Sequence, residues 1–301
     1  MKQTLFVQLA ISFLRLVSVK CPPPAGKAST TQSPGTDLSD GRNSVMQTMG
    51  AAQPSNCQGQ KMTWTKSNPG SSWGKLQLAQ NLNLYQNVWR QNIVTESGKS
   101  EITCNTFNGG ILSWDTKFSM PCKTEHNNMV KTYTNVAWAG QETIQVKNLK
   151  AFKSAWKWKL MDPSPDLVAD VSYDIFFSKD PNCRTQDCAS REAMVWLGAI
   201  GGAMPADDSP ANGNPKPIIT VGRKYEFQVF QGTVVVPVIS IIPAEKGRSF
   251  TSFEADFKGI LSQLTAFGLS PDEYIVSVGA GIEIFKGSGT LQTRKYSLEL
   301  Y

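Results

Sequence analysis

Two glutamates lie within stretches that otherwise have the pattern of β-strands, where glutamate is depleted. Glu192 lies near the start of residues 191–198 (REAMVWLG), and Glu283 is flanked by isoleucines in GAGIEIF. Because side chains alternate between the two faces of a strand, Glu192 shares its face with Met194 and Trp196. An acid, a thioether and an indole are therefore predicted to line one surface.

The surface beside Glu283 is expected to be open. Glu283 shares its face with Gly279 and Gly281, which carry no side chains and leave room for a flat ligand. A third carboxyl candidate is Asp174, which alternation places on the polar face of a strand over Leu167–Phe177. The three acids together predict a groove that binds a ligand.

Paired carboxyl groups beside aromatic rings suit cleavage of a glycosidic bond. One acid protonates the leaving oxygen, and the other, ionised, acts at the anomeric carbon about 5 to 5.5 Å away for retention or about 6.5 to 9.5 Å away for inversion. The competing interpretation is that these are edge or solvent-facing carboxylates with no catalytic role.

Composition excludes several other kinds of site. The 301 residues contain one histidine, His126, so the sequence offers no multi-histidine metal site and little scope for a Ser-His-Asp triad. The net charge of +6 comes from scattered lysines and arginines without a basic run, which argues against a nucleic-acid binder. A soluble, β-rich protein that needs no cofactor or metal is expected.

The chain is predicted to have three parts. Residues 1–20 begin with a basic end and continue with an apolar run too short to span a membrane, which indicates a secretory signal; a partly buried N-terminal helix is the alternative. Residues 21–56 are rich in Pro, Ser and Thr and are expected to be disordered. Residues 57–301 form one domain, and the protein is expected to be extracellular.

Within that domain, short alternating runs separated by Gly, Pro, Asn and Asp predict many strands and two packed antiparallel sheets or a barrel. The predicted strands are Ile111–Phe118, Thr132–Ala139, Trp156–Leu160, Leu167–Phe177, Glu192–Gly198, Ile218–Val221, Tyr225–Phe230, Val234–Ile242 and Tyr274–Phe285. One helix is predicted to lie against the outside of a sheet. It starts at a capping box of Thr251 and Glu254 and ends at Gly268.

Six cysteines in a secreted chain indicate disulfides, and six allow fifteen pairings. Cys183 and Cys188 flank a short polar loop, which favours a local bridge; Cys57 with Cys104 is the second predicted pair. A zinc site is disfavoured because the Cys-x-x-Cys spacing is missing.

Several ordered motifs resemble glycoside hydrolase family 12, the endo-β-1,4-glucanases and xyloglucanases. The segment EAMVWLGAIGGAMP (192–205) is similar to the family's nucleophile segment, and ADVSYDIFF (169–177) is similar to its Tyr-Asp-Leu-Phe strand. Further matches are QNVW (86–89), VKTYTN (130–135) and AWKW (155–158). The likeness covers residues 57–301 in the family's order.

The resemblance implies an all-β fold: a β-jelly roll of two antiparallel sheets with a concave cleft for an extended β-glucan. It also implies a retaining double displacement in which Glu192 is the nucleophile, Glu283 is the general acid and then the base, and Asp174 hydrogen-bonds the nucleophile. Trp89 would stack on a sugar ring, while Met194 and Trp196 would line the floor of the cleft. Core packing is the alternative role for Trp89 and Trp196.

Three segments depart from the family pattern, and in one of them the family's Gly-Pro-Asn-Gly turn is reduced to Gln-Gly-Thr from Gln231 on. Isoleucines 282 and 284 flank Glu283 in place of the family's Thr and Pro, and alternation turns both away from the acid. The strand predicted over Val234–Ile242 lacks the family's usual aromatic residues. With these departures noted, the resemblance as a whole implies a monomeric, secreted β-1,4-endoglucanase acting on cellulose, xyloglucan or a related glucan.

Two other functions remain open at this point. The first is a glucan-binding protein of the same fold, a decoy or an elicitor, that no longer cleaves. The second is a lectin that binds sugar through a metal, for which no cluster of Asp and Asn ligands is found in the sequence.

Overall fold

The computed structural model describes residues 57–209 and 214–301. The predicted signal (1–20) and Pro/Ser/Thr-rich segment (21–56) lie outside the described residues. Within residues 57–209 and 214–301 no helix is long and apolar enough to cross a membrane. The strands are β1 (Lys61–Thr65), β2 (Lys75–Ala79), β3 (Leu82–Tyr85), β4 (Lys99–Asn108), β5 (Ile111–Met120), β6 (Thr132–Gln145), β7 (Phe152–Met161), β8 (Val168–Ser178), β9 (Arg191–Ile200), β10 (Ile218–Val221), β11 (Tyr225–Thr233), β12 (Pro237–Pro243), β13 (Ser252–Asp256) and β14 (Tyr274–Leu300).

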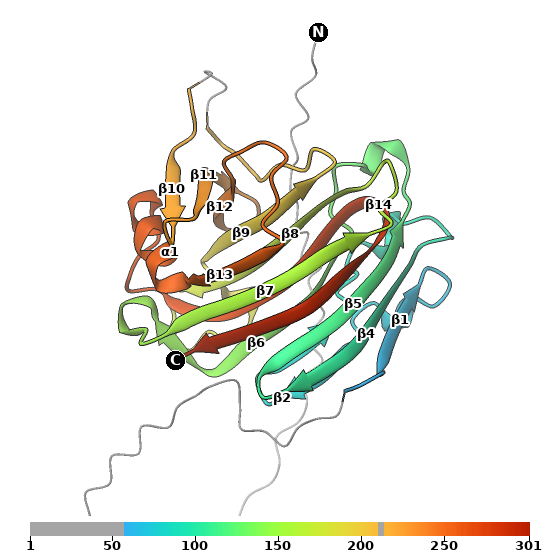
Figure 1. Cartoon of the computed structure of the whole chain (residues 1–301), viewed down its shortest axis with the longest axis horizontal. Helices are drawn as coiled ribbons and strands as arrows, with labels where there is room; N and C mark the ends of the chain where they lie inside the picture. Colours follow the sequence, from blue (N-terminus) through green and yellow to red (C-terminus); the bar gives the residue numbers. More distant parts are fainter. Residues whose placement is uncertain (1–56, 210–213) are drawn as a thin grey trace, which may run out of the picture.

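The strands form two packed sheets, which confirms the predicted jelly roll (Figure 1). One sheet has the order β1-β4-β5-β14-β7-β13, and the other has the order β2-β3-β6-β14-β8-β9-β12-β11-β10. Neighbouring strands are antiparallel except for β9 and β12, which run parallel. The six-stranded sheet is called the outer sheet below and the nine-stranded sheet the site sheet.

Strand β14 belongs to both sheets. Residues 274–286 pair with β6 and β8 of the site sheet, and residues 287–300 pair with β5 and β7 of the outer sheet. At the crossing, Gly287 has a φ of 92°, and a Cβ there would lie 2.6 Å from the Cα of Leu167. The strand predicted over Tyr274–Phe285 ends there, whereas β14 continues through Gly287 to Leu300.

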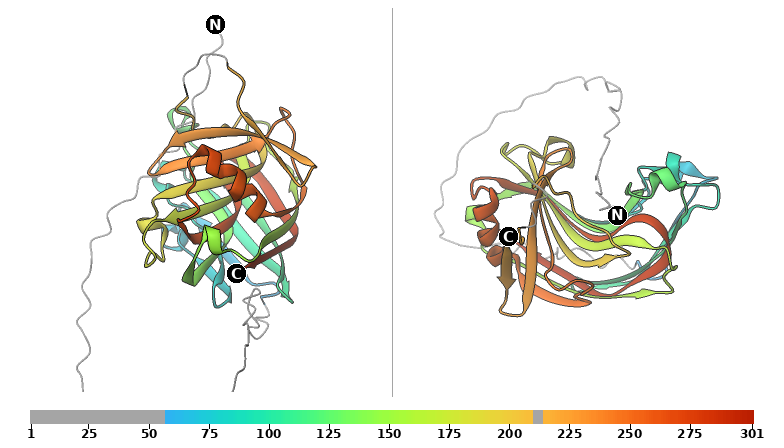
Figure 2. Two further views of the ribbon diagram at one scale, coloured as in Figure 1. Left: turned by 90° about the vertical axis from the view of Figure 1, so that its left-hand side faces the viewer. Right: turned by 90° about the horizontal axis from the view of Figure 1, so that it is seen from above.

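Large aromatic side chains fill the space between the sheets. Trp114, Trp156, Tyr173 and Tyr296 are fully buried, and the Trp156 ring meets Tyr173 edge to face with centroids 5.3 Å apart. Since Tyr173 of β8 faces this core, its neighbours Ser172 and Asp174 point to the other face of the site sheet. Figure 2 (right) shows that both layers bend in one direction, so that this other face is concave.

The helix is shorter than predicted, and its start differs. Residues 252–256 form β13, in which Phe253 pairs with Trp156 of β7. Helix α1 (Phe257–Leu264) follows, with Asp256 as its N-cap, so the predicted capping box at Thr251 is wrong. Pairing with β7 buries Phe253 and outweighs the local helix pattern. The predicted end at Gly268, in the left-handed conformation after a 3-10 turn, is confirmed.

The predicted strand over Val234–Ile242 is also wrong at its start. β11 runs on to Thr233, which pairs with Pro237 at the start of β12, and residues 234–236 form the turn between them. Pro237 has no N–H group to donate, which suits the first residue of a strand.

Both predicted disulfides are present, Cys57–Cys104 and Cys183–Cys188. Among the described residues Cys122 is the free cysteine.

Candidate active site

Three neighbouring strands of the site sheet place four carboxyl groups on its concave face. Glu283 of β14 lies directly opposite Asp170 of β8. On the other side of β8, Asp174 pairs with Met194, two residues from Glu192 of β9. Because residues opposite each other in a ladder share a face, all four carboxyl groups point away from the core. The structure therefore brings together the three predicted acids and adds Asp170.

All four carboxyl groups are deeply buried. Asp170 is 0% exposed, Glu192 2%, Glu283 3% and Asp174 6%. Burial removes water from the charged form, so in each of these acids it is the largest cause of a raised pKa. Such a cluster is typical of a functional site, since four acids stabilise a sheet less well than apolar side chains would.

Asp174 and Glu192 form one hydrogen-bonded pair. The pKa of Glu192 is raised to about 7, because burial raises it by more than the hydrogen bond from Asp174 lowers it. The pKa of Asp174 is raised well above its usual value, first by burial and then by the charge of Glu192. Asp174 therefore keeps the proton and donates it in a hydrogen bond to Glu192, which is the first of the two to ionise.

Asp170 and Glu283 form the second pair. The pKa of Asp170 is raised to about 7, because burial raises it by more than the hydrogen bonds with Ser172 and Glu283 lower it. The pKa of Glu283 is raised well above its usual value, first by burial and then by the charge of Asp170. Glu283 therefore keeps its proton when Asp170 and Glu192 ionise.

Alternation along β8 placed Asp170 on the polar face with Asp174, but it did not show which residue lies opposite Glu283. Only the register of β8 against β14 gives that neighbour. The signal in the sequence was thus a second acid on the same face, four residues before Asp174.

The space beside Glu283 is less open than the glycines suggested. A Cβ at Gly279 would lie 2.9 Å from the Asn135 amide nitrogen, and one at Gly281 would lie 2.6 Å from the Asn135 Cβ. Backbone and side-chain atoms of β6 therefore fill the room that the glycines leave. Opposite Glu283, the Tyr133 hydroxyl donates a hydrogen bond to the Ser172 carbonyl oxygen at 3.0 Å.

The predicted aromatic floor lies below the surface. Trp196 is fully buried and its indole N–H points at the Met194 sulfur at 3.5 Å, while Met194 is nearly as buried. Trp89 is partly exposed and packs against the apolar cluster that contains both. Of the three predicted ring-binding residues, Trp89 is thus the one with accessible surface, and sugar binding by any of them stays a prediction.

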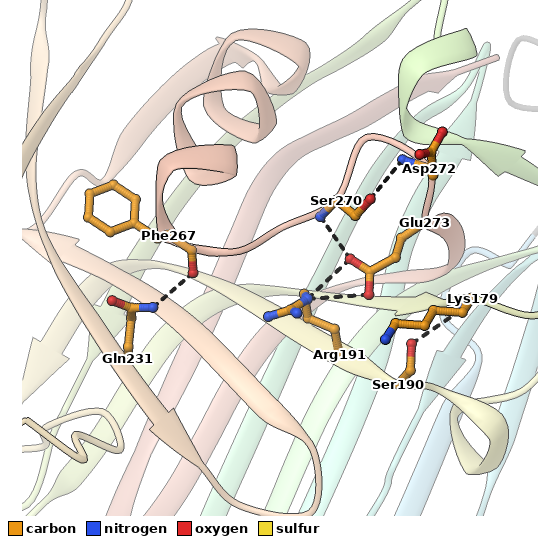
Figure 3. Close-up of polar contacts among 8 residues, drawn as sticks. All are labelled: Lys179, Ser190, Arg191, Gln231, Phe267, Ser270, Asp272 and Glu273. Atoms are coloured by element: carbon orange, nitrogen blue, oxygen red, sulfur yellow. Dashed lines mark hydrogen bonds and ion pairs between the residues drawn. The ribbon is translucent and has the colours of Figure 1, made fainter.

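An ion pair between the buried Glu273 and the partly buried Arg191 links the start of β9, which carries Glu192, to the loop before β14. The Arg191 guanidinium binds the Glu273 carboxylate at 3.1 Å, and the Ser270 amide donates to the same carboxylate at 3.0 Å (Figure 3). Arg191 precedes Glu192, and Glu273 comes just before β14. The pair therefore fixes the start of β9 against the loop that leads into β14.

The flanking isoleucines, 282 and 284, lie fully buried in the core between the sheets. Their departure from the family pattern thus changes the packing behind Glu283 and leaves the acid on the concave face. In the described ranges, no group of three or more His, Cys, Asp or Glu residues is arranged to hold a metal ion.

The arrangement combines an acid that ionises near neutral pH with one that stays protonated. The charge of Glu192 is among the causes that raise the pKa of Glu283, so the two carboxyl groups interact through space. One ionised and one protonated carboxyl group on one surface are the components of glycosidic bond cleavage.

Comparisons with known proteins agree with this chemistry. Residues 80–301 match the profile of "Glycosyl hydrolase family 12". The "Xyloglucan-specific endo-beta-1,4-glucanase A" of Emericella nidulans is 30% identical over 224 residues, which cover 74% of this chain and 87% of that protein. The "Xyloglucan-specific endo-beta-1,4-glucanase 1" of Phytophthora sojae is also 30% identical over 224 residues, which cover 73% of this chain and 85% of that protein. The fold is similar to that of Trichoderma harzianum endoglucanase 3, with a TM-score of 0.64, 23% identity, and 80% and 98% of the chains covered.

Proposed function

The chain belongs to glycoside hydrolase family 12, and from this premise we propose that it is a secreted, retaining endo-β-1,4-glucanase. It hydrolyses internal β-1,4-glucosidic bonds of a β-glucan, and xyloglucan is the first substrate to test because two of its relatives are named for that specificity. The observation that carries the proposal is the cluster of four buried carboxyl groups on one concave face, contributed by the neighbouring strands β14, β8 and β9.

In the first step, the Glu192 carboxylate attacks the anomeric carbon while Glu283 gives its proton to the leaving glycosidic oxygen. The bond from carbon to that oxygen breaks, and a covalent glycosyl ester with Glu192 forms. In the second step, the Glu283 carboxylate takes a proton from water, and the resulting nucleophile attacks the same carbon and releases Glu192. Two inversions give overall retention.

The order of ionisation supports this division of roles. The Glu192 pKa of about 7 allows ionisation near neutral pH, helped by the hydrogen bond from Asp174. Glu283 keeps its proton at higher pH, as a general acid requires. Trp89 offers an aromatic face to a sugar ring, and Met194 and Trp196 support the sheet beneath the carboxyl groups.

The test measures new reducing ends from xyloglucan and carboxymethylcellulose. Glu192→Ala and Glu283→Gln should each lower kcat by at least a hundredfold on both substrates while keeping the wild-type unfolding temperature to within a few degrees. Glu226→Gln changes an exposed glutamate and serves as the matched control with full activity. Full activity in either site variant would reject the assignment.

The stereochemistry of the first product is a second test. Proton NMR of the freshly released sugar should show the β-anomer before mutarotation. Initial release of the α-anomer would show inversion and exclude Glu192 as a nucleophile.

A further inference from the structure

We propose that Asp170 is a positioning residue for the proton donor: it shares a proton with Glu283, fixes the orientation of its carboxyl group, and keeps it protonated. This inference rests on the proposed function of Glu283. It assigns a purpose to a buried acid that neither the motifs nor the proposed roles of the other three acids require.

In the strand register Asp170 lies directly opposite Glu283, and on its other side it lies opposite Ala199. The two residues are direct partners in the β8–β14 ladder, so their side chains extend side by side from the sheet. Asp170 is fully buried, and its Oδ1 accepts a hydrogen bond from the Ser172 hydroxyl at 2.7 Å. Ser172 thus holds one oxygen of Asp170 and leaves the other available to Glu283.

One oxygen of each carboxyl group has no partner elsewhere among the described residues. Asp170 Oδ2 and Glu283 Oε2 are both buried and lack any hydrogen-bond partner outside the two carboxyl groups. Two adjacent carboxyl groups can satisfy each other only if one of them carries a proton. The geometry therefore requires a proton within the pair over the pH range in which the protein keeps this arrangement.

The other charged and titratable groups that face Glu283 do not replace this interaction. Asp174 and Glu192 add negative charge from β8 and β9, and the neutral Tyr133 hydroxyl is engaged with Ser172. The Arg90 side chain is also buried, and the pKa of its guanidinium is lowered mainly by burial and raised in part by the charge of Glu283. Arg90 would stabilise an ionised Glu283, so a partner that opposes ionisation is needed to keep Glu283 an acid.

Replacement of Asp170 by asparagine removes its negative charge and keeps the shape of the side chain. Since that charge raises the pKa of Glu283, the variant should lose its proton donor at lower pH. We expect the basic limb of the kcat/KM profile on a cello-oligosaccharide to move down by about one pH unit, which is about tenfold in rate on that limb. The acidic limb should stay in place.

An activated substrate separates positioning from structural damage. A dinitrophenyl cellobioside has a leaving group that needs no proton, so Asp170→Asn should change its kcat/KM by less than twofold. Ser172→Ala removes the hydrogen bond that holds Asp170 and lowers its pKa, but it keeps the carboxyl group in place. It should slow the oligosaccharide several-fold without moving the basic limb down, in contrast to Asp170→Asn.

Equal losses on both substrates, or an unmoved basic limb in a folded Asp170→Asn protein, would overturn the proposal. Wild-type protein that releases no reducing ends from any β-glucan would instead refute the proposed function. The pairing has an independent readout in that case: the carboxyl carbon of Glu283, followed by 13C NMR, should titrate at lower pH in Asp170→Asn than in the wild type.

Discussion

Replacement of Asp174 by alanine should shift the acidic limb of the pH profile upward. The Asp174 hydrogen bond lowers the pKa of Glu192, which burial has raised to about 7. A hydrogen bond to a charged group is worth about 1.5 to 3 kcal/mol, equivalent to roughly one to two pKa units. Water that enters the vacated space solvates Glu192 and opposes this change, so we expect a shift of about one unit.

The consequence for rate is largest below neutral pH. At pH 6 a carboxyl group with a pKa of about 7 is roughly one-tenth ionised, and a rise of one unit reduces that to about one-hundredth. The kcat/KM of Asp174→Ala at pH 6 should therefore be about tenfold below wild type, and the deficit should shrink as the pH rises toward 9.

The assay is the pH dependence of kcat/KM on dinitrophenyl cellobioside, because this substrate does not depend on the proton donor. Asp174→Asn is the matched control, since its amide still donates a hydrogen bond to Glu192, and its acidic limb should move by less than about half a unit. An acidic limb that stays in place or moves down in Asp174→Ala would refute the idea that Asp174 supports the ionised form of Glu192.

Three further predictions concern stability. All four site acids have raised pKa values, so the folded state binds more protons than the unfolded state. The free energy of unfolding should therefore fall by a few kcal/mol from pH 4 to 8, and a rise measured by calorimetry would contradict this. Removing the Cys57–Cys104 bridge, which closes a separation of 47 residues, should cost about 4 kcal/mol in denaturant unfolding, against about 2 kcal/mol for Cys183–Cys188 with its separation of 5; equal losses would argue against the chain-entropy account. Glu273→Gln removes the charge that pairs with the partly buried Arg191 and should cost about 2 kcal/mol, with a change below 1 kcal/mol as the contrary result.

Alternation within single strands predicted much of the site. It placed Glu192 on the same face as Met194, and Glu283 on the face opposite its flanking isoleucines, because the side-chain period of two depends only on local backbone geometry. The same pattern predicted the positions of most strands from residue 111 onward.

Features that depend on pairing between distant segments were not predictable in this way. The partnership of Asp170 with Glu283 depends on the register of β8 against β14, which local sequence does not encode. Strand β13 resembled the first turn of a helix until its pairing with β7 was known. The short strands β1 to β3 lie among Gly, Asn and Ser residues, which local patterns assign to loops.

The double membership of β14 has a consequence for how this molecule is made. Its four partners, β5, β6, β7 and β8, all precede it in the chain, so a ribosome completes them before the strand that joins them emerges. Until then, both incomplete sheets expose strand edges with unpaired N–H and C=O groups. Such edges favour aggregation with other chains. Synthesis interrupted before Tyr274 should therefore yield insoluble material, since neither layer can close without the missing segment.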